Sequence, residues 1–246
     1  MRIETPAIVC GLLSHGEHGA VVRLMTPEHG LQPAYVRGAR GRRMRPVLIP
    51  GNLVQARLSA RTDAHLAQAE VELTHSRGPL HGEALPAAAI EYATALTATA
   101  LPEAQPCPRL YLALDGLLGA IEAAPAASGW GAALVRYELL LLAELGFGLD
   151  LERCAVTGID EDLVAVSPRS GKAVSAVEAK PFQGKLLPLP RFLIASSSTA
   201  SWTEIIDGLA LTGHFLARDL LTDRAAPLLD GRGRLVDRLR RAAGVA

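Results

Sequence analysis

The residues with the most evident chemical potential are arginines. Seven of them lie between residues 37 and 61, a stretch without Asp or Glu, and five of these fall within nine residues. They are Arg37, Arg40, Arg42, Arg43, Arg45, Arg57 and Arg61. Because a guanidinium group binds phosphate through both its charge and its N–H donors, this block predicts a surface that binds a polyanion. A solvated, disordered loop whose charge only aids solubility is the alternative.

Charge is distributed unevenly along the chain. The 246 residues carry 25 basic and 25 acidic side chains, yet the first 80 contain ten arginines, no lysine and six acids. The remaining residues contain 15 basic and 19 acidic side chains. The N-terminal third therefore has a net charge of +4 and the rest −4, which assigns the binding of a polyanion to the N-terminal part.

The sequence lacks the motifs that commonly signal catalysis. GxxxxGK[ST], a strand-flanked GxGxxG, GxSxG and HExxH are missing, so no catalytic residue is predicted and the chain is interpreted as a non-enzyme. His15, His18 and His29 lie close together, but no Cys, Asp or Glu stands at a metal-ligand spacing beside them. Exposed turn histidines are the better interpretation. The run Asp160-Glu161-Asp162 is likewise interpreted as a solvated turn.

The cysteines point to a reducing environment. Cys10, Cys107 and Cys154 lie far apart and form no CxxC pair, so neither a disulfide framework nor a cysteine-based zinc site is expected. The sequence also has no uncharged run of 18 residues and no cleavable leader pattern. We therefore expect a cytoplasmic protein without a membrane partner.

Short apolar segments separated by turn residues predict a small barrel within residues 1–80. Strands are expected at 3–13, 20–26, 32–36, 53–60 and 66–73, with hairpin turns at residues 16–19 and 28–30. Five strands in this length favour an OB-type Greek-key barrel, a fold that binds single strands across one face. Residues 38–50 then form a long loop that carries the arginine cluster, and loops of this length are usually functional or disordered.

From about residue 83 the apolar period changes from 2 to 3.6, which predicts an all-helical domain over residues 81–246. Helices are expected at 86–100, at 109–124, from Trp130 to Leu145, after a capping box at Ser201 and Glu204, and at 234–243. Short β-type pieces predict a small, zinc-less insertion at about 151–187. The expected fold class is α+β.

Three stretches carry a family signal. They read GEHGAVVRLMTPEHGLQPAYVRGARGRRMRPVLIPGN at residues 16–52, VRYELLLLAELGFGLDLERCAVTG at 135–158 and VSPRSGKAVS at 166–175. The most specific pieces are the hairpin at Glu17 with the following RLMTPEHG, the RGAR at 37–40, and the helix from Tyr137 to Gly146 before Cys154. Together they resemble the RecO family of bacterial DNA repair and recombination mediators, and the likeness extends over nearly the whole chain.

The resemblance implies an N-terminal OB-fold, a helical C-terminal domain, binding of single- and double-stranded DNA, and strand annealing. It also implies RecR and the single-stranded DNA-binding protein SSB as partners, the RecA filament as an indirect one, and a location at the nucleoid. Many RecO-like proteins carry a zinc module of two CxxC pairs. Here Cys154 keeps the first position, Thr157 stands at the second, and no later pair exists, so no metal or cofactor is expected.

The residues themselves indicate how DNA would be bound. Tyr35 is the single aromatic residue among the first 80, whereas most single-strand binders offer several stacking platforms. Binding is therefore expected to rest on contacts between arginine and phosphate, which leave the bases free to pair with a complementary strand. The candidate DNA-binding residues are Arg23, Arg37, Arg40, Arg42, Arg43, Arg45 and Arg57.

A partner site is expected in the C-terminal part. SSB tails of the kind that the resemblance implies are acidic and end in an apolar residue, so their receptor needs a cation beside a hydrophobic groove. Arg136 and Tyr137 are the first candidates and Arg153 is the second. A core position for Tyr137 and a solvated outer face for Arg136 are the alternatives.

Two other functional classes stay open at this stage. One is an OB-fold adaptor in which the arginine loop binds structured RNA or a protein. The other is an enzyme whose site the sequence hides.

Overall fold

The structure is a computed structural model that describes residues 2–62, 65–124, 127–195, 200–222 and 225–244. Its residue contacts divide the chain into two compact units, Met1–Pro125 and Ala126–Ala246. Strands give way to helices near residue 80, where the sequence predicts the change, but the first two long helices group with the strands. The contacts thus divide the chain at residue 125 instead of residue 80.

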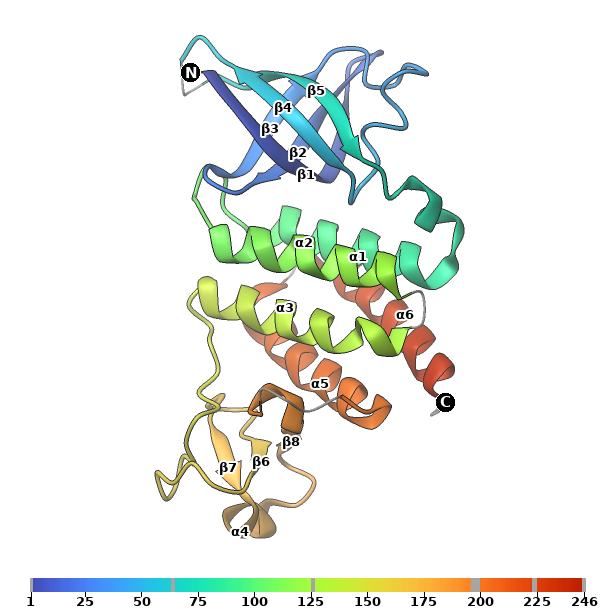
Figure 1. The fold of residues 1–246 in the computed structure, drawn as a ribbon. Coiled ribbons are helices and arrows are strands. Elements are labelled where there is room, and N and C mark those ends of the chain that lie inside the picture. Colours follow the sequence, from blue (N-terminus) through green and yellow to red (C-terminus); the bar gives the residue numbers. More distant parts are fainter. Residues whose placement is uncertain (1, 63–64, 125–126, 196–199, 223–224, 245–246) are drawn as a thin grey trace. The chain divides into compact units, whose positions relative to one another are not determined.

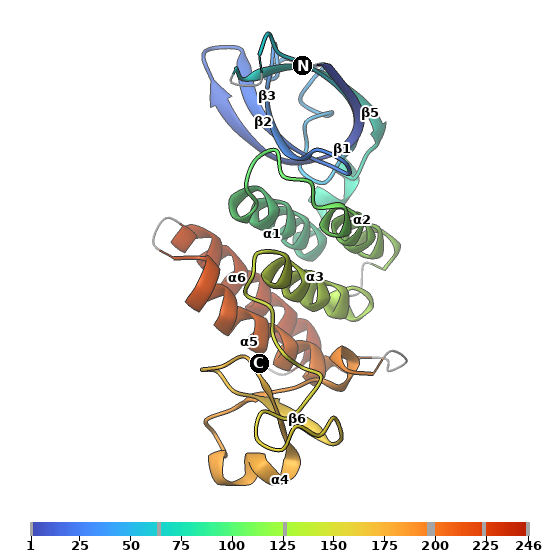
Figure 2. The same cartoon turned by 90° about the vertical axis from the view of Figure 1, so that its left-hand side faces the viewer.

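The first unit begins with a closed five-stranded barrel (Figures 1 and 2). Around the barrel the strands follow the order β1-β2-β3-β5-β4. Their bounds are β1 (Arg2–His15), β2 (Gly19–Thr26), β3 (Gly30–Val36), β4 (Leu53–Ser59) and β5 (Ala67–His75). Neighbouring strands are antiparallel except β3 and β5, which pair in parallel. The predicted OB-like barrel is confirmed, and each strand lies within a few residues of its expected place.

Alternating side chains fill the barrel. In β4, Val54, Ala56 and Leu58 are at most 1% exposed, whereas Arg57 and Ser59 face the solvent. This is the period of two that the sequence shows, because successive side chains of a strand point to opposite faces. Gly16 and Gly30 have φ values of 65° and 67°, which allows the two tight turns expected at their positions.

The long segment between β3 and β4 is folded onto the barrel. Ala39 and Leu48 are 4% and 3% exposed and belong to the barrel core, and Met44 and Val47 pack against that core. The backbone N–H of Leu48 donates to the carbonyl of Met44 at 3.0 Å. The alternative of a disordered loop therefore does not describe these residues.

Asn52 ties the end of this segment to the chain that follows the barrel. Its side chain is fully buried and donates to the carbonyls of Pro46 at 2.8 Å and Val47 at 3.1 Å. Its side-chain oxygen accepts from the backbone N–H of Arg77 at 2.8 Å. One amide thus satisfies three backbone groups from two segments.

Helices α1 (Ala84–Ala100) and α2 (Pro108–Ala123) complete the first unit. Helix α1 contacts β1 and β2, where the fully buried Ile8 and Met25 lie outside the barrel core. The buried Arg77 donates to the carbonyl of Gly51 at 2.7 Å and pairs with Asp115 of α2 at 3.3 Å. The helices therefore continue the packing of the barrel, which explains the unit boundary at residue 125.

The second unit contains α3 (Gly131–Glu144), α5 (Trp202–Phe215) and α6 (Ala226–Ala243). The predicted capping box is present, since the Ser201 hydroxyl accepts from the Glu204 N–H and the Glu204 side chain accepts from the Ser201 N–H. The expected start of the last helix, Arg234, is wrong, because α6 begins eight residues earlier at Ala226. A proline in its first turn suits a helix start, and its glycines mask the helical signal in the sequence.

The insertion holds a small three-stranded sheet in the order β7-β6-β8. Its elements are β6 (Leu163–Val166), β7 (Ala173–Ser175), α4 (Ala176–Ala179) and β8 (Leu187–Pro188). Strand β7 ends at Ser175 because α4 follows directly. Strand β8 has only two residues, too few for a periodic pattern.

Cys154 forms hydrogen bonds with other residues of this insertion. Its sulfur accepts from the Ser175 N–H at 3.4 Å and lies 3.6 Å from the Ser175 hydroxyl. Burial raises the pKa of the thiol, but hydrogen bonds from Thr157, Ser175 and the Val156 N–H lower it to about 6. Within the part of the chain that the structure describes, no three His, Cys, Asp or Glu residues form a group that could hold a metal ion.

Candidate nucleic-acid interface

The arginine loop between β3 and β4 turns its charged side chains outward. Arg37, Arg40, Arg42, Arg43 and Arg45 are all exposed. Among the described residues, no carboxylate forms an ion pair with any of the five. Since Ala39, Met44, Val47 and Leu48 anchor the same segment in the barrel, the loop backbone is fixed while the guanidinium groups stay available to an anion.

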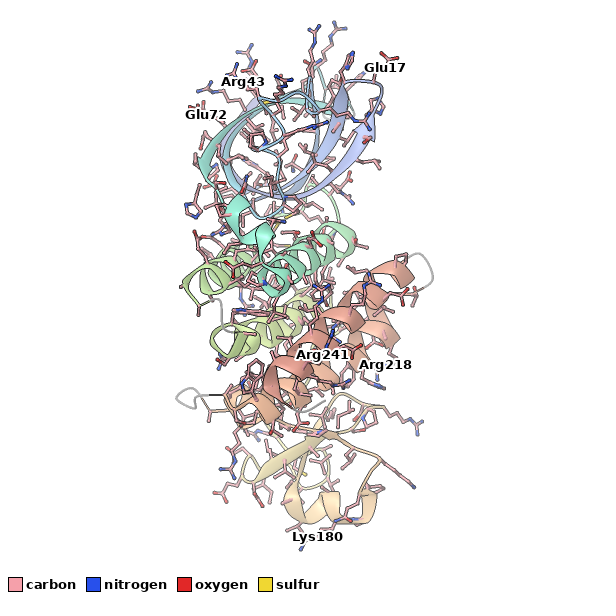
Figure 3. The ribbon with its side chains drawn as sticks, turned by 90° about the vertical axis from the view of Figure 1, so that its right-hand side faces the viewer. Glu17, Arg43, Glu72, Lys180, Arg218 and Arg241 are labelled. Carbon is pink, nitrogen blue, oxygen red and sulfur yellow. The ribbon has the colours of Figure 1, made fainter. Side chains whose placement is uncertain are left out.

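Arg40 connects the loop to the hairpin between β1 and β2. Its guanidinium donates to the Ser14 hydroxyl at 2.8 Å and to the Glu17 carbonyl at 3.5 Å, and its backbone N–H donates to the His18 carbonyl at 3.4 Å. Figure 3 places Arg43 of the loop and Glu17 of the hairpin at the same end of the barrel, away from α1 and α2. The loop and the hairpin therefore form one end surface.

Arg23 and Arg57 differ from the loop arginines because each faces a carboxylate. Arg23 donates to the Ala98 carbonyl at 2.7 Å and pairs with Glu103 at 2.5 Å. It is bound within the first unit and makes a poor ligand for phosphate. Arg57 pairs with Glu4 at 3.3 Å, but both side chains are more than half exposed, so water screens this pair and an anion can still approach.

Three adjoining hollows run along the outside of β1, β4, β5 and the end of β3. The two at either side share residues with the middle one, which has a volume of about 680 Å³. Their charged lining residues are Arg2, Arg37, Arg43, Arg57, Arg61, Glu4, Glu70 and Glu72. Together the three hollows form a groove that is lined by cations near the loop and by both cations and carboxylates along the strands.

Sequence reasoning missed two features of this groove. Arg2 contributes from the start of β1, far from the arginine cluster in sequence. Glu4, Glu70 and Glu72 lie on the solvent-facing side of β1 and β5 and bring negative charge to the groove. The alternation in the strands already contained this signal, because Glu70 and Glu72 share the face opposite the buried Ala69.

The partner candidates of the second unit have different surroundings. The Tyr137 side chain is 1% exposed, which matches the core alternative and removes it from any surface. Arg136 donates to the Phe192 carbonyl at 3.0 Å, and its guanidinium lies 5.1 Å from the centre of the Phe192 ring. Arg153 is exposed. The structure therefore supplies a cation on an aromatic ring at Arg136 and a separate exposed cation at Arg153.

Comparison with known proteins decides the family. Residues 1–77 match the family model described as Recombination protein O N terminal, and residues 85–225 match the one described as Recombination protein O C terminal. The chain belongs to the RecO family. The resemblance noted in the sequence is thereby confirmed.

Several curated RecO proteins are similar to this chain over nearly its full length. "DNA repair protein RecO" of Phenylobacterium zucineum is 42% identical over 244 residues, covering 98% of this chain and 99% of that protein. The proteins of the same name from Caulobacter vibrioides strain NA1000 and Bradyrhizobium sp. strain ORS 278 are 43% and 44% identical. The Caulobacter match covers 98% of this chain and 99% of that protein, and the Bradyrhizobium match 98% and 97%.

Membership of the RecO family assigns the chain a role in DNA repair and recombination. In this RecO protein, none of the described helices is long and apolar enough to cross a membrane.

Proposed function

We propose that this RecO protein is a non-enzymatic mediator that binds single- and double-stranded DNA through the arginine loop of its barrel. The observation that carries the proposal is the set of exposed arginines, anchored in the barrel by buried apolar neighbours and without ion pairs to the described carboxylates. Anchoring matters because an ordered loop backbone loses less conformational entropy when its arginines meet phosphate. In this proposal, residues 1–80 are the DNA-binding domain.

Strand annealing follows from the chemistry of these contacts. Two single strands repel each other through their phosphates, and arginines that neutralise phosphate remove part of that repulsion. The loop itself carries no aromatic side chain, so most bases bound along it stay unstacked by protein. Neutralised phosphates and free bases together allow complementary strands to meet.

We further propose that residues 81–246 bind the protein partners RecR and SSB. The RecA filament would be an indirect partner. Arg136 and Arg153 are the candidate contacts for an acidic SSB tail. Arg136 supports this best because its exposed side chain is fixed by the Phe192 carbonyl and ring, which presents a positioned cation to an acidic tail. The protein would act in the cytoplasm, on DNA of the nucleoid.

The decisive experiment measures DNA affinity against salt concentration. Replacing Arg40, Arg42, Arg43 and Arg45 with Ala should lower the slope of log affinity against log salt by about 3 for a single strand, since each phosphate contact contributes about 0.7. The matched control removes four exposed cations of the insertion instead, by Ala replacement of Arg169, Lys172, Lys180 and Lys185. An unchanged slope in the loop variant would exclude the loop from the DNA site.

Two further arms separate the functions. Single-stranded RNA and a structured RNA are titrated under the same conditions, and a preference for structured RNA would favour the adaptor function instead. Annealing of complementary oligonucleotides coated with SSB then tests strand binding and SSB binding together. Arg136→Ala should slow annealing of the coated strands and leave the uncoated strands unaffected.

A further inference from the structure

A row of outward side chains crosses the barrel strands beside the arginine loop. Leu13 of β1 pairs with Val21 of β2, and Val21 pairs with Tyr35 of β3. Their neighbours Ala20, Ala34 and Val36 belong to the barrel core, so the three side chains of the row point outward. Leu13 is 72% exposed, so with Val21 and Tyr35 it gives this outer face of the barrel an apolar strip.

The aromatic end of this row is held in a defined position. His15 lies edge-on to the Tyr35 ring, with 5.8 Å between ring centres and 79° between the planes. The Tyr35 ring also crosses the backbone of Gly19, where a Cβ atom would come within 2.3 Å of it. A side chain at residue 19 would displace this ring, so Gly19 allows Tyr35 to lie across the outer face of the barrel.

The platform adjoins the phosphate-binding arginines. Tyr35 lines the middle hollow of the groove together with Arg37 and Arg57, and Arg37 follows it by two residues on the same face. At the other end of the row, Arg40 donates to Ser14, which pairs with the core residue Ala20 and therefore points to the opposite face from Leu13. The cations thus adjoin the row at its Tyr35 end, an arrangement in which a strand can place phosphates on Arg37 and Arg57 and a base on the row.

We propose that Leu13, Val21 and Tyr35, with His15, form a base-contacting platform for single-stranded DNA. This inference rests on the proposed DNA binding and adds one subsite to it. Aromatic and apolar side chains stack on base faces without reading their sequence, and only an unpaired strand exposes those faces. One platform holds a base or two, which orients the strand while its remaining bases stay free for annealing.

The test compares two ligands with equal charge. The wild-type protein is titrated with oligothymidine and with an abasic oligonucleotide of the same length, at one salt concentration. The thymidine strand should bind about fivefold or more tightly, the lower end of the effect of stacking one base. Tyr35→Leu and, separately, Leu13→Ser should bring that ratio close to one, while the slope against salt stays unchanged.

Two control variants and a cross-link guard against indirect effects. Tyr35→Phe keeps the ring and should keep the ratio, and Leu112→Ser removes an equally exposed leucine of α2 and should change nothing. A strand that contains 5-iododeoxyuridine should cross-link to Tyr35 on irradiation. Leu13 lies at an exposed position, so its variant tests the proposal even if Tyr35→Leu fails to fold.

The outcomes separate this inference from the proposed function. If the wild-type protein binds both oligonucleotides equally, with a steep salt slope and no cross-link at Tyr35, DNA binding stands and the platform is refuted. The exposed row would then belong to a protein interface. If neither oligonucleotide binds, the proposed DNA binding itself fails.

Discussion

Arginines of the barrel loop and Arg232 of helix α6 have opposite surroundings. Arg43 and its neighbours in the loop are exposed and meet no described carboxylate. Arg232 is 8% exposed and donates to both carboxylate oxygens of the fully buried Glu138, at 2.8 and 2.9 Å. It also donates to the Leu209 carbonyl at 2.7 Å, and Thr212 donates to Glu138.

The same residue type can therefore stabilise one unit and, in the proposed function, bind DNA from the other. A buried guanidinium loses its hydration, so it needs a carboxylate and further acceptors to remain charged. Arg232 has these, and it links α6 to α3 and α5. The loop arginines keep their hydration and can exchange it for phosphate. We therefore expect substitutions at the buried pair to change the free energy of unfolding, and substitutions in the loop to change DNA affinity and its dependence on salt.

The largest effect is expected at the buried pair. Glu138→Gln removes the charge that compensates Arg232 and should lower the free energy of unfolding by about 3–5 kcal/mol. Urea unfolding measures this directly. Asp237→Asn is the control, because it breaks an exposed pair with Arg240 of the same helix, where only about 0–1 kcal/mol is expected. Equal losses in the two variants would contradict the distinction between the regions.

A smaller effect is expected at Asn52, where the barrel fixes the end of the arginine loop. Asn52→Ala leaves the carbonyls of Pro46 and Val47 and the N–H of Arg77 without their partner, which should cost about 1–3 kcal/mol of unfolding free energy. DNA affinity should also fall, while the salt slope stays the same because no charge is lost. Gln55→Ala, on the outer face of β4, should change stability by about 0.5 kcal/mol or less. Unaltered DNA affinity in Asn52→Ala would show that the loop needs no anchoring.

Much of the fold follows from local patterns in the sequence. The alternation in β4 and β5, the turn glycines and the capping box at Ser201 all have short-range causes, and the structure confirms each. The start of α6 was missed because Gly231 and Gly233 weaken the helical pattern. Pairings between distant residues have no local signal at all.

The candidate site shows the same limit. Exposure of the loop arginines follows from their density and the absence of nearby acids, which the sequence displays. The ion pair between Arg23 and Glu103 joins residues 80 positions apart. It forms because the segment after α1 folds back onto β2, which no local pattern in the sequence indicates. The row from Leu13 to Tyr35 likewise requires the register of three strands, which composition alone does not supply.

The smallest effect compares two arginines within the first unit. Arg43→Ala should lower the salt slope for single-stranded DNA by about 0.7, because one phosphate contact is lost. Arg23→Ala removes the same charge, but its guanidinium is already bound to Glu103 and the Ala98 carbonyl, so the slope should stay at the wild-type value. Fluorescence anisotropy over a salt series resolves the two. An equal fall in both slopes would mean that Arg23 leaves Glu103 and binds phosphate when DNA binds. The ion pairs of the unbound protein would then not predict which arginines contact DNA.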